Sequence, residues 1–225
     1  MSALANMIAG SNFAERIFTD RQLRDIICGS DARRYGLVNR ALKDGSLIRL
    51  KRGLYILSHQ HRRGEIHPFV AAQAILPGSY VSFETALAHY RLIPEAVSIT
   101  ASVTPQRKSV SYQAPPFGEF TYHPLAIADY QFMACVRRAE LAGQVAFVAS
   151  PLRAIMDVVA QRKIEWDGLG WLTSGMRIDE EGLLSFVAED FEALRPVYKH
   201  RAARAFLTAM QEALCGPISH QEYAA

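Results

Sequence analysis

A β-hairpin is predicted at residues 47–57, because two short apolar runs there are separated by only three residues. The runs are Leu47–Leu50 and Leu54–Leu57, and Gly53 between them can take the positive φ of a tight turn. A helix is predicted directly before the hairpin, over Asp31–Asp44, with Ser30 as its N-cap. A helix followed at once by a hairpin restricts this end of the chain to few architectures.

Two further helices are predicted before this one. Thr19 and Gln22 have the spacing of a capping box, which starts a short helix that ends near Cys28. The apolar pattern of residues 3–17 predicts another helix. The order helix, helix, helix, hairpin predicts a winged helix-turn-helix domain over residues 1–60.

Charge is distributed unevenly along the 225 residues. Residues 1–66 hold 12 Lys and Arg against 6 Asp and Glu, whereas residues 67–225 hold 13 against 16. A basic small part beside a faintly acidic large part favours a nucleic-acid-binding module joined to a domain with another task. The polar segment His59–Glu65 is predicted to be a linker, so the predicted domains are residues 1–60 and 61–225.

The third predicted helix has an apolar and a basic side. At about 100° per residue, Tyr35, Val38, Ala41 and Leu42 share the side that we expect to be buried. Leu37 falls on the opposite side, among the cationic residues. A solvated basic face would explain this helix alone, but further cations at the hairpin tip favour contact with DNA. The predicted DNA-binding residues are Arg33, Arg34, Asn39, Arg40, Lys43, Arg49, Lys51 and Arg52.

The rest of the chain is predicted to be a mixed α+β domain with C-terminal helices. Strand patterns occur at residues 80–81, 97–104, 109–113, 119–122, 130–136 and 145–148. Helix patterns occur at residues 69–76, 83–90, 151–162, 180–194 and 197–214, and residues 166–176 are predicted to be a loop. Pro68 and Pro151 suit the first position of their helices.

Several short motifs follow one another between residues 19 and 160: Leu47–Tyr55, Tyr80–Leu87, Leu92–Glu95, Val103–Arg107, Phe120–His123 and Val148–Asp157. Their succession resembles the AbiEi family of antitoxins, which regulate transcription of type IV toxin–antitoxin (abortive infection) operons. The resemblance implies a winged helix that binds inverted repeats of double-stranded DNA in its own promoter, with a possible dimer on the DNA. It also implies a second domain that opposes a nucleotidyltransferase-like toxin, without a stable complex being assumed.

The resemblance places candidate antitoxin residues on a surface of the second domain: Ser82, Glu84, Arg107, Tyr122, His123, Arg153 and Asp157. Structural roles are the alternative for some of them. Ser82 can cap a helix, Tyr122 can be a half-buried strand residue, and Arg153 can pair with Asp157 four residues later.

Catalytic and metal-binding motifs are lacking. The sequence has no GxxxxGK[ST], GxGxxG, GxSxG or HExxH pattern. His59, His61 and His67 have no Cys or Asp nearby in the sequence, and three separated cysteines form no metal knuckle. We therefore expect no enzyme, no cofactor and no metal, although Ser82, His89, His123 and Asp157 leave a hydrolase arrangement open.

A cytoplasmic protein is expected, because no apolar run approaches the roughly 18–20 residues of a membrane span. Met1–Gly10 also lacks the features of a secretory signal. The alternative function is an effector-sensing regulator without an antitoxin role. A large apolar pocket within residues 67–165 would favour the effector sensor, whereas a shallow charged surface would favour the antitoxin.

Overall fold

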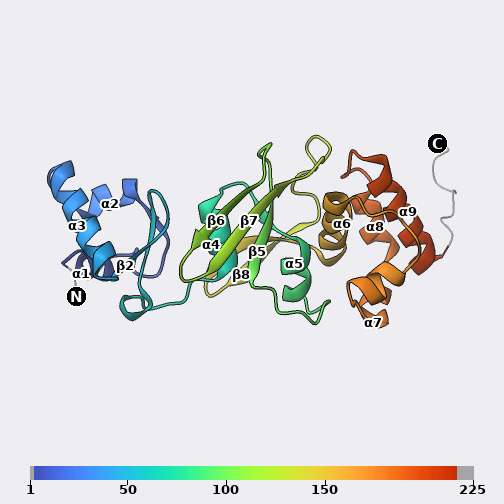
Figure 1. Ribbon diagram of the computed structural model, residues 1–225, viewed down its shortest axis with the longest axis horizontal. Helices are drawn as coiled ribbons and strands as arrows, with labels where there is room; N and C mark the ends of the chain where they lie inside the picture. The colour runs from blue at the N-terminus through green and yellow to red at the C-terminus, as the bar shows by residue number, and fades with distance from the viewer. Residues whose placement is uncertain (1–2, 217–225) are drawn as a thin grey trace.

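The computed structural model describes residues 3–216 and is elongated (Figure 1). A small helical module with a three-stranded sheet lies at one end, a six-stranded sheet lies in the middle, and helices α7–α9 lie at the other end (Figure 1). The molecule is therefore of the α+β class, as predicted.

The N-terminal module is a winged helix-turn-helix. Its elements are α1 (Ala3–Ala9), β1 (Phe18–Thr19), α2 (Asp20–Ile26), α3 (Asp31–Lys43), β2 (Leu47–Lys51) and β3 (Leu54–Leu57). The strands are antiparallel in the order β1-β3-β2. The predicted capping box is present, since the Gln22 amide donates to Thr19 Oγ1 at 3.3 Å and the Thr19 amide donates to Gln22 Oε1 at 2.8 Å. The two-residue strand β1 is too short for a sequence pattern to indicate.

The buried side of α3 differs from the prediction. Tyr35 is 72% exposed, whereas Leu37, expected on the outer side, packs partly against the core with Leu42. Val38 and Ala41 are buried as predicted. The helix is thus rotated about its axis, because a leucine gains more from burial than a tyrosine whose hydroxyl must then find a partner.

The central sheet has the strand order β6-β7-β5-β4-β9-β8. Its strands are β4 (Tyr80–Val81), β5 (Ile99–Thr104), β6 (Val110–Ala114), β7 (Gly118–Pro124), β8 (Val136–Leu141) and β9 (Gln144–Ala149). The pairs β5–β7 and β4–β9 are parallel and the others antiparallel. The strand predicted at residues 130–136 is wrong, because Tyr130 and Cys135 have φ values of 65° and 55° and the segment turns.

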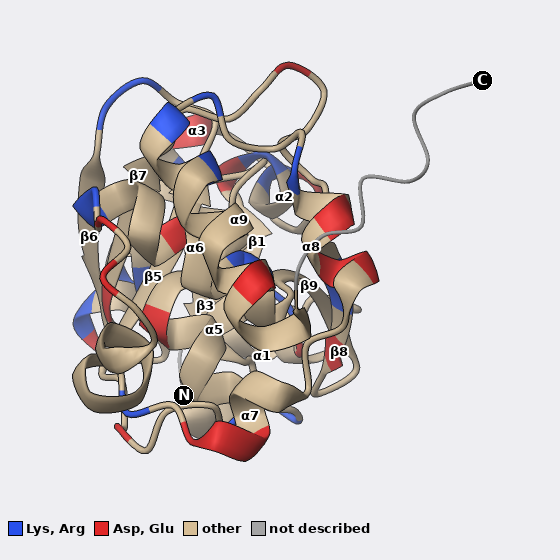
Figure 2. Ribbon diagram, turned by 90° about the vertical axis from the view of Figure 1, so that its right-hand side faces the viewer, with Lys and Arg blue, Asp and Glu red and all other residues tan. Residues whose placement is uncertain are grey.

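Helices cover the sheet and close the far end. They are α4 (Pro68–Ile75), α5 (Phe83–His89), α6 (Pro151–Arg162), α7 (Glu180–Leu184), α8 (Ala188–Leu194) and α9 (Arg201–Cys215). The single helix predicted at residues 180–194 is wrong, because the Asp190 carboxylate accepts from the Val187 amide at 3.2 Å and starts a new helix there. The predicted loop at residues 166–176 contains a π-helical turn, Trp171–Gly175. Figure 2 shows acidic residues on α7 and α8, where Glu180 and Glu189 lie in the first turns.

Two clusters of buried apolar side chains meet at the hairpin. The first contains residues of the winged module only, such as Phe18 and Leu47. The second extends through the sheet and the C-terminal helices, and it also takes in Leu50, Leu54 and Ile56 of the hairpin. The division into domains 1–60 and 61–225 stays a prediction. Cutting the chain between the two domains would remove the packing of Leu50, Leu54 and Ile56 against the second cluster.

Candidate nucleic-acid interface

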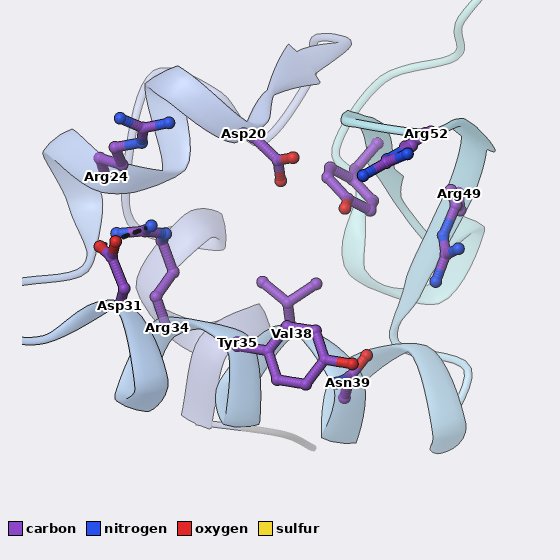
Figure 3. Close-up of a pocket in the computed structure, with 10 residues that line it drawn as sticks. Asp20, Arg24, Asp31, Arg34, Tyr35, Val38, Asn39, Arg49 and Arg52 are labelled. Atoms are coloured by element: carbon purple, nitrogen blue, oxygen red, sulfur yellow. Dashed lines mark hydrogen bonds and ion pairs between the residues drawn. The ribbon is translucent and has the colours of Figure 1, made fainter.

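A hollow of about 420 Å³ lies between α2, α3 and the hairpin (Figure 3). It is lined by Asp20, Arg24, Asp31, Arg34, Tyr35, Val38, Asn39, Arg49, Arg52 and Tyr55. Each of the three elements thus contributes at least one cationic side chain to the same concave surface.

The hollow carries a net positive charge. The Asp31 carboxylate forms an ion pair with Arg34, and Arg34 Nη2 lies 2.8 Å from Asp31 Oδ1. Within residues 3–216, Arg24, Arg49 and Arg52 form no ion pair with a carboxylate. Exposed guanidinium groups without a protein partner can donate to the phosphates of a nucleic acid backbone.

Asp20 holds the wing against the first turn of α2. Its amide donates to the Gly53 carbonyl at 3.0 Å, and burial together with the Asp20 charge raises the pKa of the Tyr55 phenol. Gly53 has a φ of 77°, and a Cβ there would lie 3.2 Å from Asp20 Oδ2. The turn therefore requires glycine, and these contacts hold the wing tip against the start of α2.

The structure gathers half of the predicted DNA-binding residues around this hollow, namely Arg34, Asn39, Arg49 and Arg52. Arg33, Arg40 and Lys43 are exposed on α3 but do not line it. Arg40 Nε donates to the Gly36 carbonyl at 3.2 Å on its own helix.

Lys51 turns away from the hollow toward the sheet. Its Nζ donates to the Ile75 carbonyl at 2.9 Å and lies 5.4 Å from the centre of the Tyr112 ring. The side chain therefore joins the wing to α4 and β6.

Replacing Lys51 by methionine is expected to lower the free energy of unfolding by about 1 kcal/mol, the usual net value of a hydrogen bond. It should leave the salt dependence of DNA binding unchanged. Thermal unfolding and binding at several salt concentrations measure the two effects. A salt slope reduced by about 1 would instead make Lys51 a phosphate contact.

Arg24 and Tyr35 line the hollow but are not among the residues predicted to bind DNA. Arg24 lies on α2, where the capping box and the apolar residues mark the helix but do not indicate an exposed arginine as a DNA contact. Tyr35 was assigned to the buried side of α3. The hydroxyl of Tyr35 is the signal that could have indicated its exposure, because a tyrosine tolerates contact with water better than the leucine at position 37.

Four of the seven candidate antitoxin residues are buried, so their expected place on a surface is wrong. Ser82, Tyr122, Arg153 and Asp157 are each 0% exposed. Ser82 Oγ makes no cap bond and donates instead to Asp157 Oδ2 at 2.7 Å. Tyr122 donates to the Ala72 carbonyl at 2.6 Å. These four side chains form hydrogen bonds inside the domain, with one another or with backbone carbonyls.

The other three candidates are accessible. Arg107 is exposed in the turn between β5 and β6, and Glu84 forms an ion pair with Arg162. His123 is half-buried against the Phe83 ring, with the centres 5.6 Å apart. Burial lowers the pKa of His123 although Glu84 opposes this, so the imidazole is neutral at neutral pH.

Glu84 and His123 line a second hollow, of about 330 Å³, between α5, α6 and the sheet. Apolar side chains of β5 and its preceding loop, Val97 and Ile99, border it, and the Glu84–Arg162 ion pair lies at its rim. The hydrolase arrangement does not form within residues 3–216, because the buried Ser82 and Asp157 bond to each other and make no hydrogen bond to the imidazole of His89 or His123.

No group of three or more potential ligands that could hold a metal ion occurs within residues 3–216. In the same part of the chain, no helix is long and apolar enough to cross a bilayer.

A winged helix-turn-helix whose helix and wing share a basic hollow is an arrangement typical of DNA-binding domains. Residues 13–58 match the model of a family described as "Transcriptional regulator, AbiEi antitoxin". The match covers α2, α3 and the wing, and it confirms for this segment the family resemblance indicated by the motifs. No curated protein matches the chain.

Proposed function

We propose that the protein is a cytoplasmic autorepressor and antitoxin of a type IV toxin–antitoxin operon. It acts without catalysis and without a cofactor. Its winged helix binds an inverted repeat in its own promoter, with two copies meeting on the double-stranded DNA. Its second part opposes a nucleotidyltransferase-like toxin, and a stable complex is not required.

The observation that carries the DNA-binding half of this proposal is the hollow with four arginines. Arg34 comes from α3, Arg24 from α2, and Arg49 and Arg52 from the wing, so one surface offers donors on three elements. Phosphate contacts supply most of the affinity of such modules, while base contacts supply the discrimination. One module covers a single half-site, and two copies are needed for useful specificity in a genome.

The second hollow supports the antitoxin over the effector sensor. Its volume of about 330 Å³ lies at the lower end of small-molecule sites, and an ion pair stands at its rim. A surface with both polar and apolar side chains suits a macromolecular partner better than it suits a small apolar ligand, which needs an enclosed pocket.

Replacing Arg49 and Arg52 together by alanine is expected to weaken binding to operator and random DNA alike. Each lost phosphate contact should reduce the slope of log K against log salt by about 0.9, hence by nearly 2 for the pair. Fluorescence anisotropy with a labelled duplex at four salt concentrations measures this slope.

The matched control replaces Arg201 and Arg204, which are exposed at the start of α9, at the opposite end of the molecule (Figure 1). The control removes the same charge and should leave the slope unchanged. Equal slopes for both double variants would contradict the assignment of the wing.

A further inference from the structure

Tyr35 is an exposed aromatic residue on a helix whose other large apolar side chains face the core. It is 72% exposed, whereas Val38 is 7% exposed and Leu37 and Leu42 pack partly against the buried cluster. Among residues 3–216 no ring contact or hydrogen bond of Tyr35 is found. The stability of the module therefore does not explain this side chain.

The position of Tyr35 is central to the basic hollow. Figure 3 shows its ring beside Asn39 along α3, with Arg34 on one side and Arg49 across the hollow. Tyr35 and Asn39 are four residues apart, so they lie on one face of the helix. The arginines around them would hold the DNA backbone, which brings this face close to the base edges.

We propose that Tyr35 and Asn39 read an A·T-containing step, with the Tyr35 ring against the C5-methyl group of a thymine. This inference rests on the proposed DNA binding and names the bases that it discriminates. An apolar ring surface suits the thymine methyl, the one apolar group that bases present in the major groove. The Asn39 amide suits a neighbouring adenine, to which it can both donate and accept.

The ring, and not the hydroxyl, carries the discrimination. Tyr35→Phe keeps the apolar surface and should keep the preference, whereas Tyr35→Ala removes it. Because the side chain is exposed and unpacked, neither change should affect folding. Circular dichroism and the salt slope on random DNA serve as controls for both variants.

The test uses the full-length protein and an operator obtained by in vitro selection. Each thymine of a half-site is replaced in turn by deoxyuridine, which lacks only the methyl group. At one position the wild type and Tyr35→Phe should bind about fourfold more weakly, the value of one buried methyl group. Tyr35→Ala should bind the thymine and deoxyuridine duplexes equally at that position.

Two results would overturn the inference while leaving DNA binding intact. One is an equal loss on deoxyuridine substitution for wild type and Tyr35→Ala, which would place another residue at the methyl. The other is a half-site in which no thymine responds. If selection instead returns no preferred sequence for the wild type, the proposed operator binding fails together with this inference.

Discussion

Replacing Asp157 by alanine is expected to lower the free energy of unfolding by about 3–5 kcal/mol, the cost of breaking a buried ion pair on one side. Asp157 accepts four hydrogen bonds inside the protein. Arg153 Nε and the Tyr198 hydroxyl donate to Oδ1 at 2.9 and 2.7 Å, and the Ser82 and Tyr80 hydroxyls donate to Oδ2 at 2.7 and 3.1 Å. Removal of the carboxylate leaves the 0% exposed Arg153 charge without its counter-ion.

The remaining groups of this cluster are adapted to the ion pair. Burial raises the pKa of the Tyr80 and Tyr198 phenols and Asp157 raises it further, so both stay protonated and donate. Burial lowers the pKa of Arg153, but the Asp157 charge and the two tyrosines outweigh it and raise the value above normal. The guanidinium lies 5.3 Å from each tyrosine ring centre.

Chemical denaturation measures the loss, and calorimetry should show a decrease in Tm of about 2–4 °C for each kcal/mol. Glu192→Ala provides the control, because its ion pair with Arg195 is partly exposed and such pairs contribute at most about 1 kcal/mol. Similar, small losses for Asp157→Ala and Glu192→Ala would contradict the structural role.

Local sequence signals predicted the local structure of this chain well. The capping box at Thr19, the cap at Ser30 and the prolines at Pro68 and Pro151 mark helix starts that the structure confirms. Each of these signals depends only on residues within one turn of helix, so it does not depend on tertiary contacts with the rest of the chain.

Burial was less predictable, because it depends on partners far away in the sequence. The spacing of Arg153 and Asp157 allows a pair on one helix face, but that face is interior because of partners far away in the sequence, such as Tyr80 and Tyr198. The same limit applies to α3, where the helical period places Tyr35 on the buried side, whereas the helix packed against α1 and β2 leaves Tyr35 exposed and brings Leu37 against the core. Sites on helix faces are therefore harder to derive from a sequence than the helices themselves.

Deletion of residues 1–60 is expected to abolish operator binding and to leave a folded fragment. All six strands of the central sheet lie within residues 80–149, and the Arg153–Asp157 cluster also lies in the retained part. The fragment loses the packing of Leu54 and Ile56 and the Lys51 bond to Ile75, so it should unfold at a lower temperature than the full chain. Circular dichroism and thermal melts measure both.

The antitoxin proposal requires that this fragment still protect cells. In a growth assay, the fragment and the full-length Arg49→Ala, Arg52→Ala variant are each expressed with the nucleotidyltransferase-like toxin that the proposal places in the same operon. Both should restore growth at least partly, because neither change touches the accessible residues Glu84, Arg107 and His123. An effector sensor would give no protection by either protein. An unfolded fragment would refute the two-domain division. The full-length Arg49→Ala, Arg52→Ala variant would then decide the antitoxin role alone. This variant keeps the contacts between the wing and the sheet, because they are made by Lys51, Leu54 and Ile56.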